Sequence, residues 1–304
     1  MPDILKYDVL VIGSLNADLV VRVKHFPLPG ETISGDDLQI IPGGKGANQA
    51  VAAARQGARV AMIGCVGKDG FGSFLLDSLN SNNVDTSHVR VDESSTGTAT
   101  IIVESNGQNS IVLSSGANGK VSAKDIEAFK LDAKILLLQL EIPLEIVIHA
   151  AQWGRQKGMT VILNPAPASE LPAELLSNTD YIIPNETELD LLSGVPVIDI
   201  SSAEQAAKVM IDQGAKNVIV TLGDRGALFV SSNQVAYVEP YKINVIDTTA
   251  AGDAFIGGFA SALLRGVENM EAVKYANACG ALAATKFGAQ PSLPTKEKLE
   301  KFIS

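Results

Sequence analysis

The chain has 304 residues, 46% of them hydrophobic and 19% charged, which is enough to bury a sizeable core in one large α/β domain or two small ones. Its formal net charge of −10 excludes nucleic acid and acidic membrane surfaces as expected partners, because both select cationic proteins. Two cysteines, Cys65 and Cys279, cannot form a disulfide framework, and we find neither a signal-peptide pattern nor an apolar run of ~20 residues, so we expect a soluble protein of the cytoplasm.

Short runs rich in Val, Ile and Leu alternate with helical segments along most of the chain. Such almost continuously apolar strands are typical of a sheet covered by helices on both faces. The alternation of strands and helices therefore predicts a mostly parallel, doubly wound α/β sheet. Its strands are expected at residues 8–12, 60–63, 135–138, 160–163, 181–183 and 218–221, with helices at 47–56, 145–157 and 203–213.

A second group of strand-like runs interrupts this alternation. The dipeptide Asn106-Gly107 between two of them is a strong hairpin signal. These runs predict a small separate sheet inserted into the α/β domain, and a further hairpin, 227–231 with 235–239, is expected at the edge of the main sheet. The four inserted runs cover residues 17–23, 38–41, 98–104 and 110–114.

Polar residues and glycines follow the ends of the predicted strands. In an open α/β sheet, ligands bind beyond the carboxyl ends of the strands. Every strand also ends in a turn, so this position alone does not decide between a ligand-binding site and ordinary turns. The residues concerned are Asn16, Asp18, Gly64, Glu141, Asn164, Asn185 and Gly223.

Residues 42–48, Pro-Gly-Gly-Lys-Gly-Ala-Asn, open an Ala-rich helix. Glycines allow a ligand to approach the backbone, and the start of a helix offers free N–H groups with a partial positive charge. Lys45 and Asn48 favour a binding site over an ordinary glycine turn. The segment is not a Walker A loop, because Lys45 is followed by Gly46 rather than by Ser or Thr.

Residues 247–255, Asp-Thr-Thr-Ala-Ala-Gly-Asp-Ala-Phe, lead into a second helix. The small residues at 250–252 leave the backbone N–H groups at the helix start unobstructed, so these groups could form an anion hole. Asp253 would then lie in the first turn, where it could accept a proton from a nearby hydroxyl. The alternative is that Asp253 only complements the helix dipole.

Two further segments have a functional and a structural interpretation each. Residues 184–188, Pro-Asn-Glu-Thr-Glu, could order Mg²⁺ through water, or Asn185 and Glu188 could simply form a capping box. Residues 221–226, Thr-Leu-Gly-Asp-Arg-Gly, could line a nucleotide or could be a turn into the next strand. Neither segment decides the matter alone.

In this order, the segments near residues 45 and 250 resemble the two signatures of the ribokinase family of sugar kinases. The resemblance extends from Val11 to Ser292, almost the whole chain. It implies an enzyme that uses ATP to phosphorylate the 5-hydroxyl of D-ribose. Many relatives have Gly at the position of Ala250, whereas Ala-Ala-Gly-Asp is typical of the branch that acts on ribose.

The resemblance also implies roles for individual residues. Asp253 would be the catalytic base, with Ala250, Ala251 and Gly252 in the anion hole. The sugar would be held by Asn16, Asp18, Gly44, Lys45, Asn48 and Glu141. ATP would be bound by Asn185, Thr221, Gly223, Asp224, Gly226, Gly252 and Asn277, and Glu188 would act on Mg²⁺ indirectly. A monovalent cation, usually K⁺, would be bound by Asp247, Thr249, Ala283, Lys286, Gly288 and Ser292.

The resemblance implies a single domain over residues 1–304. Its inserted sheet, roughly 16–42 and 95–115, would be a lid over the sugar, through which family members form homodimers. Three other functions remain: a kinase for deoxyribose, fructose or a nucleoside, a silent sugar-binding regulator, and a dinucleotide-dependent oxidoreductase. The presence of Gly252 and Asp253 disfavours the regulator. The oxidoreductase would need a Gly-x-Gly-x-x-Gly after the first strand, which the chain lacks.

Overall fold

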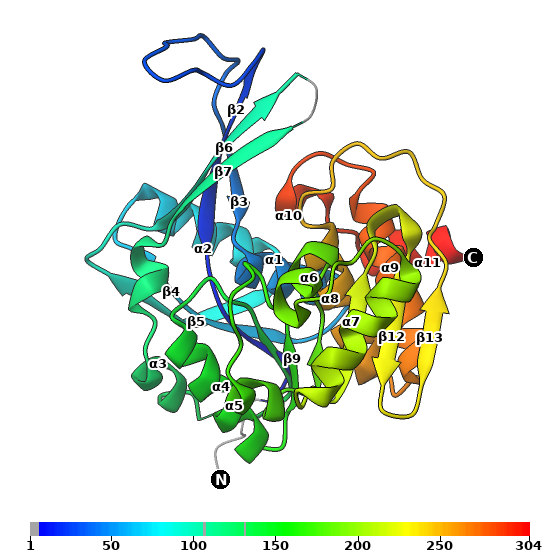
Figure 1. The fold of residues 1–304 in the computed structure, drawn as a ribbon. Helices are drawn as coiled ribbons and strands as arrows, with labels where there is room; N and C mark the ends of the chain where they lie inside the picture. The colour runs from blue at the N-terminus through cyan, green and yellow to red at the C-terminus, as the bar shows by residue number, and fades with distance from the viewer. Residues whose placement is uncertain (1–5, 106–107, 131) are drawn as a thin grey trace.

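The computed structural model describes residues 6–105, 108–130 and 132–304, and a nine-stranded sheet runs through its centre (Figure 1). The strands pair in the order β13-β12-β11-β10-β9-β8-β1-β4-β5, parallel except for β12 and β13, which pair antiparallel at one edge. Their bounds are β1 Lys6–Ile12, β4 Val60–Gly67, β5 Val84–Asp92, β8 Asp132–Leu138, β9 Thr160–Leu163, β10 Tyr181–Ile182, β11 Asn217–Thr221, β12 Ala227–Ser231 and β13 Val235–Val238.

The strand order reverses beside β1, which confirms the predicted doubly wound sheet. From β1 the chain builds β4 and β5 on one side and β8 to β13 on the other. Ile12 and Leu138, the last residues of β1 and β8, are paired neighbours. Ligands of such sheets bind in the crevice at this reversal, beyond the carboxyl ends of the strands.

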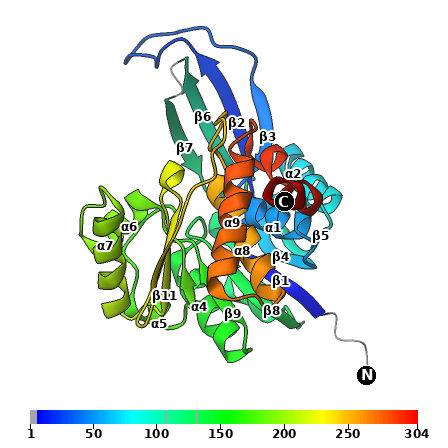
Figure 2. The same cartoon turned by 90° about the vertical axis from the view of Figure 1, so that its right-hand side faces the viewer.

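Helices cover both faces of the sheet, as its apolar strands predict (Figure 2). Alternate residues of β1 enter opposite cores: Val9 and Val11 join one hydrophobic cluster, Leu10 and Ile12 the other. Helices α1, α2, α8, α9 and α11 contribute to the first cluster, and α3 to α7 to the second. The helices are α1 Lys45–Arg55, α2 Gly70–Ser81, α3 Ala123–Glu127, α4 Leu144–Gln156, α5 Ala173–Ser177, α6 Glu186–Ser193, α7 Ile200–Asp212, α8 Ala251–Leu264, α9 Asn269–Ala283, α10 Ala289–Ser292 and α11 Lys296–Ile303, with 3₁₀ turns η1 Gly116–Lys120 and η2 Gly223–Arg225.

A four-stranded sheet projects from the body of the molecule, and we call it the small sheet (Figure 1). Its strands are β3 Gln39–Gly43, β2 Asn16–Val23, β6 Gly97–Glu104 and β7 Asn109–Ser114, in that spatial order. All four inserted strands predicted from the sequence are therefore present. The predicted turn Asn106-Gly107 lies outside the described residues, but the antiparallel pairing of β6 with β7 is the pairing expected of a hairpin.

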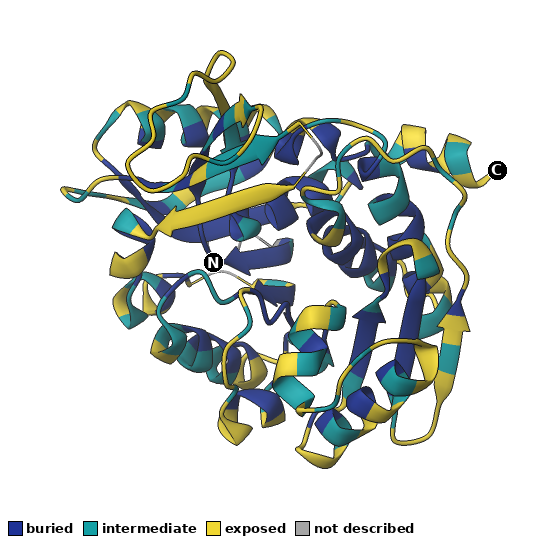
Figure 3. Cartoon of the chain, turned by 45° about the horizontal axis from the view of Figure 1, so that its top comes forward, coloured by how far each residue is buried: buried dark blue, intermediate teal, exposed yellow. Residues whose placement is uncertain are grey.

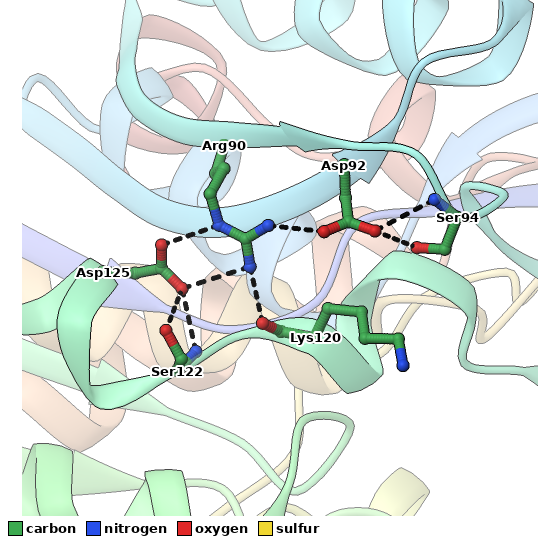
Figure 4. A network of polar contacts seen from close by, with 6 residues as sticks. All are labelled: Arg90, Asp92, Ser94, Lys120, Ser122 and Asp125. Carbon is green, nitrogen blue, oxygen red and sulfur yellow. Dashed lines mark hydrogen bonds and ion pairs between the residues drawn. The ribbon is translucent and has the colours of Figure 1, made fainter.

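A polar network fastens β5 to the segments before β6 and after β7 (Figure 4). The Arg90 guanidinium donates to the Asp125 carboxylate at 2.8 Å, to Asp92 at 2.6 Å and to the Lys120 carbonyl at 2.5 Å. Asp92 in turn accepts the N–H and hydroxyl of Ser94, just before β6. Since Lys120 and Asp125 follow β7, one arginine holds the chain where it enters and where it leaves this part of the small sheet.

Two predictions about the bulk properties can be compared with the structure. Both cysteines, Cys65 and Cys279, are free and buried. Among the described residues, none of the helices combines the length and apolar character that crossing a bilayer demands.

Candidate active site

The ends of β1 and β8 meet at the reversal of the strand order, and glycine allows their close approach. A Cβ atom on Gly13, directly after β1, would collide with the side-chain oxygen of Gln139, directly after β8. A Cβ atom on Gly46 would collide with the backbone of Ser14. The glycine-rich segment at the start of α1 is therefore packed against the chain that follows β1.

One carboxylate oxygen of Glu141 joins the chain after β1 to the start of α1. Its Oε2 accepts the Ser14 hydroxyl at 2.5 Å, the Lys45 backbone N–H at 3.1 Å and the side-chain amide of Asn16 at 3.3 Å. Asn16, Lys45 and Glu141 are three of the residues predicted to contact the sugar, and the structure brings them together.

Asn118 of η1 orients Asn16, and the sequence contains no motif that identifies it. The Asn118 side chain is buried, accepts the N–H of Leu15 at 2.9 Å, and donates to the Leu15 carbonyl at 3.0 Å and to Asn16 Oδ1 at 2.7 Å. The Asn16 amide must therefore direct its N–H₂ toward Glu141. A Cβ atom on Gly97 would collide with both asparagines, so β6 also requires glycine here.

Asp18 is a buried carboxylate on the inner face of the small sheet. It is 7% exposed and packs directly on Gly43, where a Cβ atom would collide with it. Burial raises the pKa of Asp18 to about 7, with repulsion from Glu141 and Asp253 adding to the rise and Lys45 opposing it. The carboxylate is therefore held near its titration point in a site that concentrates negative charge.

Lys45 balances that charge. It interacts electrostatically with Asp253, Glu141, Glu188 and Asp18. Although burial alone would lower the pKa of Lys45, these four carboxylates hold it above its ordinary value. Lys45 therefore remains a cation, placed between the predicted sugar-binding residues and the predicted phosphate-binding residues.

The start of α8 places Asp253 in its first turn, as predicted. Ala250 precedes the helix with a φ of 60°, a left-handed conformation that glycine adopts more easily than alanine. The Ala251 N–H donates to the Thr248 carbonyl at 3.1 Å, so it is not free for an anion in this conformation. A Cβ atom on Gly252 would meet open space, which leaves the helix start unobstructed.

The Asp253 carboxylate connects α8 to the glycine-rich segment. It is 6% exposed, and its Oδ2 accepts the side-chain amide of Asn48 at 3.0 Å while its Oδ1 accepts that of Gln49 at 3.0 Å. Within the described residues, the buried Oδ1 of Asn48 has no hydrogen-bond partner. That acceptor is therefore available for a ligand hydroxyl.

Asn185 and Glu188 form a capping box at the start of α6, which was one of the two interpretations of this segment. Asn185 Oδ1 accepts the Glu188 N–H at 2.8 Å, and the two oxygens of Glu188 accept the backbone and side-chain N–H groups of Asn185 at 2.9 and 3.0 Å. Burial raises the pKa of Glu188, although Asn185 and Lys45 oppose this. Since both oxygens are engaged, Glu188 fits a Mg²⁺ ion held through water rather than directly.

The predicted nucleotide-binding residues lie along the next strand ends. Thr221 at the end of β11 forms a β-bridge with Asn185, and Gly223 and Gly226 both adopt positive φ in the turn at η2. Asp224 is exposed in that turn, and Asn277 on α9 donates to the Glu239 carbonyl at 2.8 Å. Asn185, Thr221 and Gly223 are thus neighbours, whereas Asn277 reaches this region from the opposite layer of helices.

Asp247 organises the predicted cation site. Its Oδ1 accepts the N–H and hydroxyl of Thr249, and its Oδ2 accepts the Gly288 N–H at 2.8 Å. The structure thus joins three of the six predicted ligands. Carboxylate, hydroxyl and carbonyl oxygens are the hard ligands that an alkali cation requires, so the donor set fits. The others are Ala283, Lys286 and Ser292, of which Ala283 accepts the Lys286 N–H and the buried Ser292 hydroxyl donates to the Ala289 carbonyl.

Two cavities flank the sugar-binding candidates. One, of about 240 Å³, lies between the inner face of the small sheet and loop 245–249; Asp18, Arg22, Ile101, Asp247, Thr249 and Phe287 are among its lining residues. The other, of about 260 Å³, is bounded among others by Asn16, Leu113, Asn118, Glu141, Pro143 and Pro167. Arg22 also lies over the Phe287 ring at 4.9 Å, so the small sheet contacts the body across the first cavity.

Comparisons with known proteins agree with this architecture. The model of the pfkB family of carbohydrate kinases matches residues 6–296, and the chain belongs to that family. It is 46% identical to the ribokinase of Haemophilus influenzae, with 96% of this chain and 97% of that protein aligned. It is also 40% identical to the deoxyribokinase of Salmonella typhi over 98% of this chain and 99% of the relative.

Among solved structures, the fold is similar to that of Arabidopsis thaliana ribokinase complexed with ribose and ATP. The TM-score is 0.91 at 35% identity, and the match covers 99% of both chains. The predicted family and fold class are thereby confirmed.

Proposed function

We propose that this protein transfers the γ-phosphoryl group of ATP to the 5-hydroxyl of D-ribose, which gives ribose 5-phosphate and ADP. One observation carries the proposal: the Asp253 carboxylate at the start of α8 is hydrogen-bonded to Asn48 of the glycine-rich segment, 205 residues away in sequence. A carboxylate that faces a sugar pocket at an unobstructed helix start has the composition of a phosphoryl-transfer site.

In this proposal Asp253 is the general base. It accepts the proton of the 5-hydroxyl as that oxygen attacks the γ-phosphorus, and the bond to the leaving oxygen of ADP breaks. The free N–H groups at the first turn of α8, with Gly252 at the most open position, stabilise the negative charge on the transferring group. Lys45 adds a cation between the two substrates.

The sugar lies between the small sheet and the glycine-rich segment. Carboxylates accept hydrogen bonds from vicinal hydroxyls, and Asp18 and Glu141 provide two. Asn16, oriented by Asn118, adds an amide donor, and the unpartnered Oδ1 of Asn48 accepts a hydroxyl. The small sheet acts as a lid whose closure excludes water and limits wasteful hydrolysis of ATP.

ATP binds along the ends of β10 and β11, with Mg²⁺ held through water near Glu188. There, bound Mg²⁺ would neutralise negative charge on the phosphates of ATP. A monovalent cation such as K⁺ is held at Asp247, Thr249 and Gly288, beside the start of α8. The Glu188 carboxylate at the start of α6 supports the first assignment, and the side-chain oxygens of Asp247 and Thr249 support the second.

Deoxyribose is the strongest alternative substrate, since a deoxyribokinase is among the similar proteins. A coupled assay of ADP release across ribose, 2-deoxyribose, fructose and a nucleoside tests the choice directly. We expect the highest kcat/KM with ribose and less activity when a bulky organic cation replaces K⁺. A preference for deoxyribose would overturn the assignment of ribose, and activity independent of the cation would remove the cation site.

The role of Asp253 is tested by Asp253→Asn in the same assay. We expect kcat to fall by about 10²–10⁴-fold or more, the range for lost general-base catalysis, because an amide cannot accept the proton. Asp212→Asn, at an exposed position at the end of α7, is the control and should alter kcat far less. A turnover of Asp253→Asn close to that of the unmodified protein would contradict the proposed base.

A further inference from the structure

Three buried amide side chains form a hydrogen-bonded series that ends at Asp253, and the proposed function assigns no role to any of them. Gln49 of α1 and Gln139 after β8 are both 0% exposed, and Asn164 after β9 is 7% exposed. Gln49 Nε2 donates to Asp253 Oδ1 at 3.0 Å and to Asn164 Oδ1 at 3.3 Å. Gln139 Nε2 donates to Gln49 Oε1 at 2.6 Å. The group connects the catalytic helix start to the ends of two central strands.

A backbone carbonyl determines which way each amide points. The Ile183 carbonyl can only accept, so the Asn164 amide directs its Nδ2 to it, at 3.1 Å, and leaves Oδ1 as an acceptor. Gln49 must then direct Nε2 toward Asn164 and Asp253, and Oε1 toward Gln139. Each orientation follows from the one before, so Asp253 always receives a donor from Gln49.

Gln139 donates to Gln49 at a cost in free energy. Its Oε1 is buried beside Gly13 and, within the described residues, has no hydrogen-bond partner. A buried acceptor without a partner costs about 1–3 kcal/mol. If the Gln139 amide were flipped, its Oε1 would face Oε1 of Gln49. That oxygen would still have no donor, and the two acceptors would repel each other. The arrangement is the one expected where Gln139 is required as a donor to Gln49.

We infer that Gln49 is a positioning residue for phosphoryl transfer, which holds the Asp253 carboxylate at the angle needed to accept the proton of the sugar. This inference rests on the proposed role of Asp253 as base. Gln49 is fully buried, so it has no route to a substrate, and it acts through Asp253 alone. Asn48 holds the other carboxylate oxygen, but it is also a predicted sugar ligand, which leaves Gln49 as the anchor on the protein side.

Charge does not supply this anchoring. Lys45, Asp18 and Glu188 interact electrostatically with Asp253, and a substitution of Gln49 leaves all three in place. Gln49 instead fixes the orientation of the Asp253 carboxylate. A misplacement of about 1 Å in a reacting group costs about 10²-fold in rate, which sets the scale of the expected effect.

The test is Gln49→Met, which keeps the length of the side chain and removes its hydrogen bonds. We expect kcat to fall by about 10–100-fold, with KM for ribose and for ATP within about twofold of the unmodified protein. Gln56→Met is the matched control. Gln56 is a buried residue at the end of α1, and its two amide atoms hydrogen-bond to Pro294 and Tyr275 rather than to Asp253. Its kcat should stay within about twofold.

A double substitution separates positioning from general damage. In the Asp253→Asn background, Gln49→Met should lower kcat by less than about twofold, because a residue that acts through Asp253 has nothing left to position. A further loss as large as that of the single variant would overturn the inference, as would an unchanged kcat in Gln49→Met. If Gln49→Met does not fold, Gln139→Met decides, with an expected loss in kcat of about 3–10-fold at constant KM.

These outcomes are distinct from the failure of the proposed function. A folded, unmodified protein that phosphorylates none of the sugars would overturn both the kinase and the role of Gln49. An active protein whose Gln49→Met and Gln139→Met variants retain full kcat would overturn only the role of Gln49. Activity on a sugar other than ribose would leave this test intact, with that sugar as substrate.

Discussion

Asp18, one of the proposed sugar-binding residues, is buried at a cost in stability. It is almost completely buried beside Glu141 and Asp253, with a pKa of about 7 against an ordinary value of 3.8. A carboxyl group whose pKa is raised on folding stabilises the protein fully below the ordinary value. That contribution is lost as the pH rises through the folded value. Above pH 7 the protein therefore carries an unfavourable buried charge until a sugar supplies hydroxyl donors.

Asp18→Asn should make the protein more stable and a poorer enzyme. At pH 8 we expect the free energy of unfolding to rise by at most about 4 kcal/mol, since one pKa unit corresponds to about 1.4 kcal/mol. The gain should disappear near pH 4. KM for ribose should rise by about 10–100-fold, the value of a hydrogen bond to a charged acceptor. Urea unfolding at several pH values and steady-state kinetics measure both effects.

Asp37→Asn is the control for this experiment, because Asp37 is exposed in the same part of the chain. It should change neither quantity. A gain in stability for Asp18→Asn that is as large at pH 4 as at pH 8 would contradict the charge explanation.

At the scale of residues, the sequence predicted what its motifs contain and missed what depends on packing. Asn48 and Asp253 belong to recognisable segments, and the fold brings them into contact as expected. Asn118, Gln49 and Gln139 act through partners up to 204 residues away, and a lone amide in a sequence has no feature that predicts such a partner. The capping box of Asn185 and Glu188 was one of two interpretations of its segment, and only the structure establishes it.

At the scale of elements, the attachment of the small sheet is the feature with the clearest consequence. Arg90 on β5 fixes the segments before β6 and after β7 (Figure 4). Although burial opposes it, the Arg90 guanidinium helps to hold the pKa of Asp125 below its ordinary value. The small sheet carries Asp18, and η1 after it carries Asn118. The contacts of Arg90 therefore help to hold the proposed sugar site against the body.

Arg90→Leu should therefore affect both stability and substrate binding. We expect a loss of about 1–2 kcal/mol in the free energy of unfolding, reduced from the value of a fully buried charged bond because Arg90 is partly exposed. KM for ribose should rise several-fold. Because the pKa of Asp125 is lowered on folding, the loss in stability should shrink at acidic pH, where Asp125 is protonated in both states.

Arg155→Leu provides the comparison. Arg155, in the last turn of α4, forms a similarly exposed ion pair with Asp180 at 2.8 Å. Figure 1 shows α4 in the lower half of the molecule and the small sheet at its top. Arg155→Leu should lower stability without raising KM. Equal effects of the two variants on KM would show that Arg90 has no special connection to the sugar site.

Elements were predicted well where their patterns are strong. Residues 160–163 were predicted as a strand and form β9, and the inserted strands differ from their predicted bounds by one or two residues. Strand β5, Val84–Asp92, was not predicted, because its polar residues resemble a loop when its position at the edge of the sheet is unknown. Helix α1 begins at Lys45 rather than at residue 47, since the glycines of the segment do not prevent helix formation there.

At the scale of the whole molecule, the outer face of the small sheet carries a group of aliphatic side chains, and its edge strand β7 is exposed along its length (Figure 3). The register places Asp18 and Ala99 on the face toward the body, so the alternate residues point outward. Every residue of β7 is exposed, and Val112 is 65% exposed. The outward aliphatic side chains are Leu19, Val21, Val23, Ile40, Ile102 and Val112.

An apolar sheet face of this kind indicates contact with a partner surface of similar shape and chemistry. A second copy of the chain provides one, since two small sheets can pack face to face about a twofold axis. This is the homodimer predicted through the lid. Because the inner face of the same sheet bears Asp18, dimerisation would also restrain the sugar pocket.

In the proposed homodimer, Val112→Lys should favour the monomer, because it places a charge between two opposed apolar faces, where desolvation is costly. Light scattering or sedimentation measures the mass, and kinetics in the same buffer should show a raised KM for ribose. Ile198→Lys is the matched control: Ile198 is 76% exposed between α6 and α7, so this variant should remain a dimer with unchanged KM. A monomeric unmodified protein, or a Val112→Lys variant that remains dimeric, would remove the small sheet as the interface.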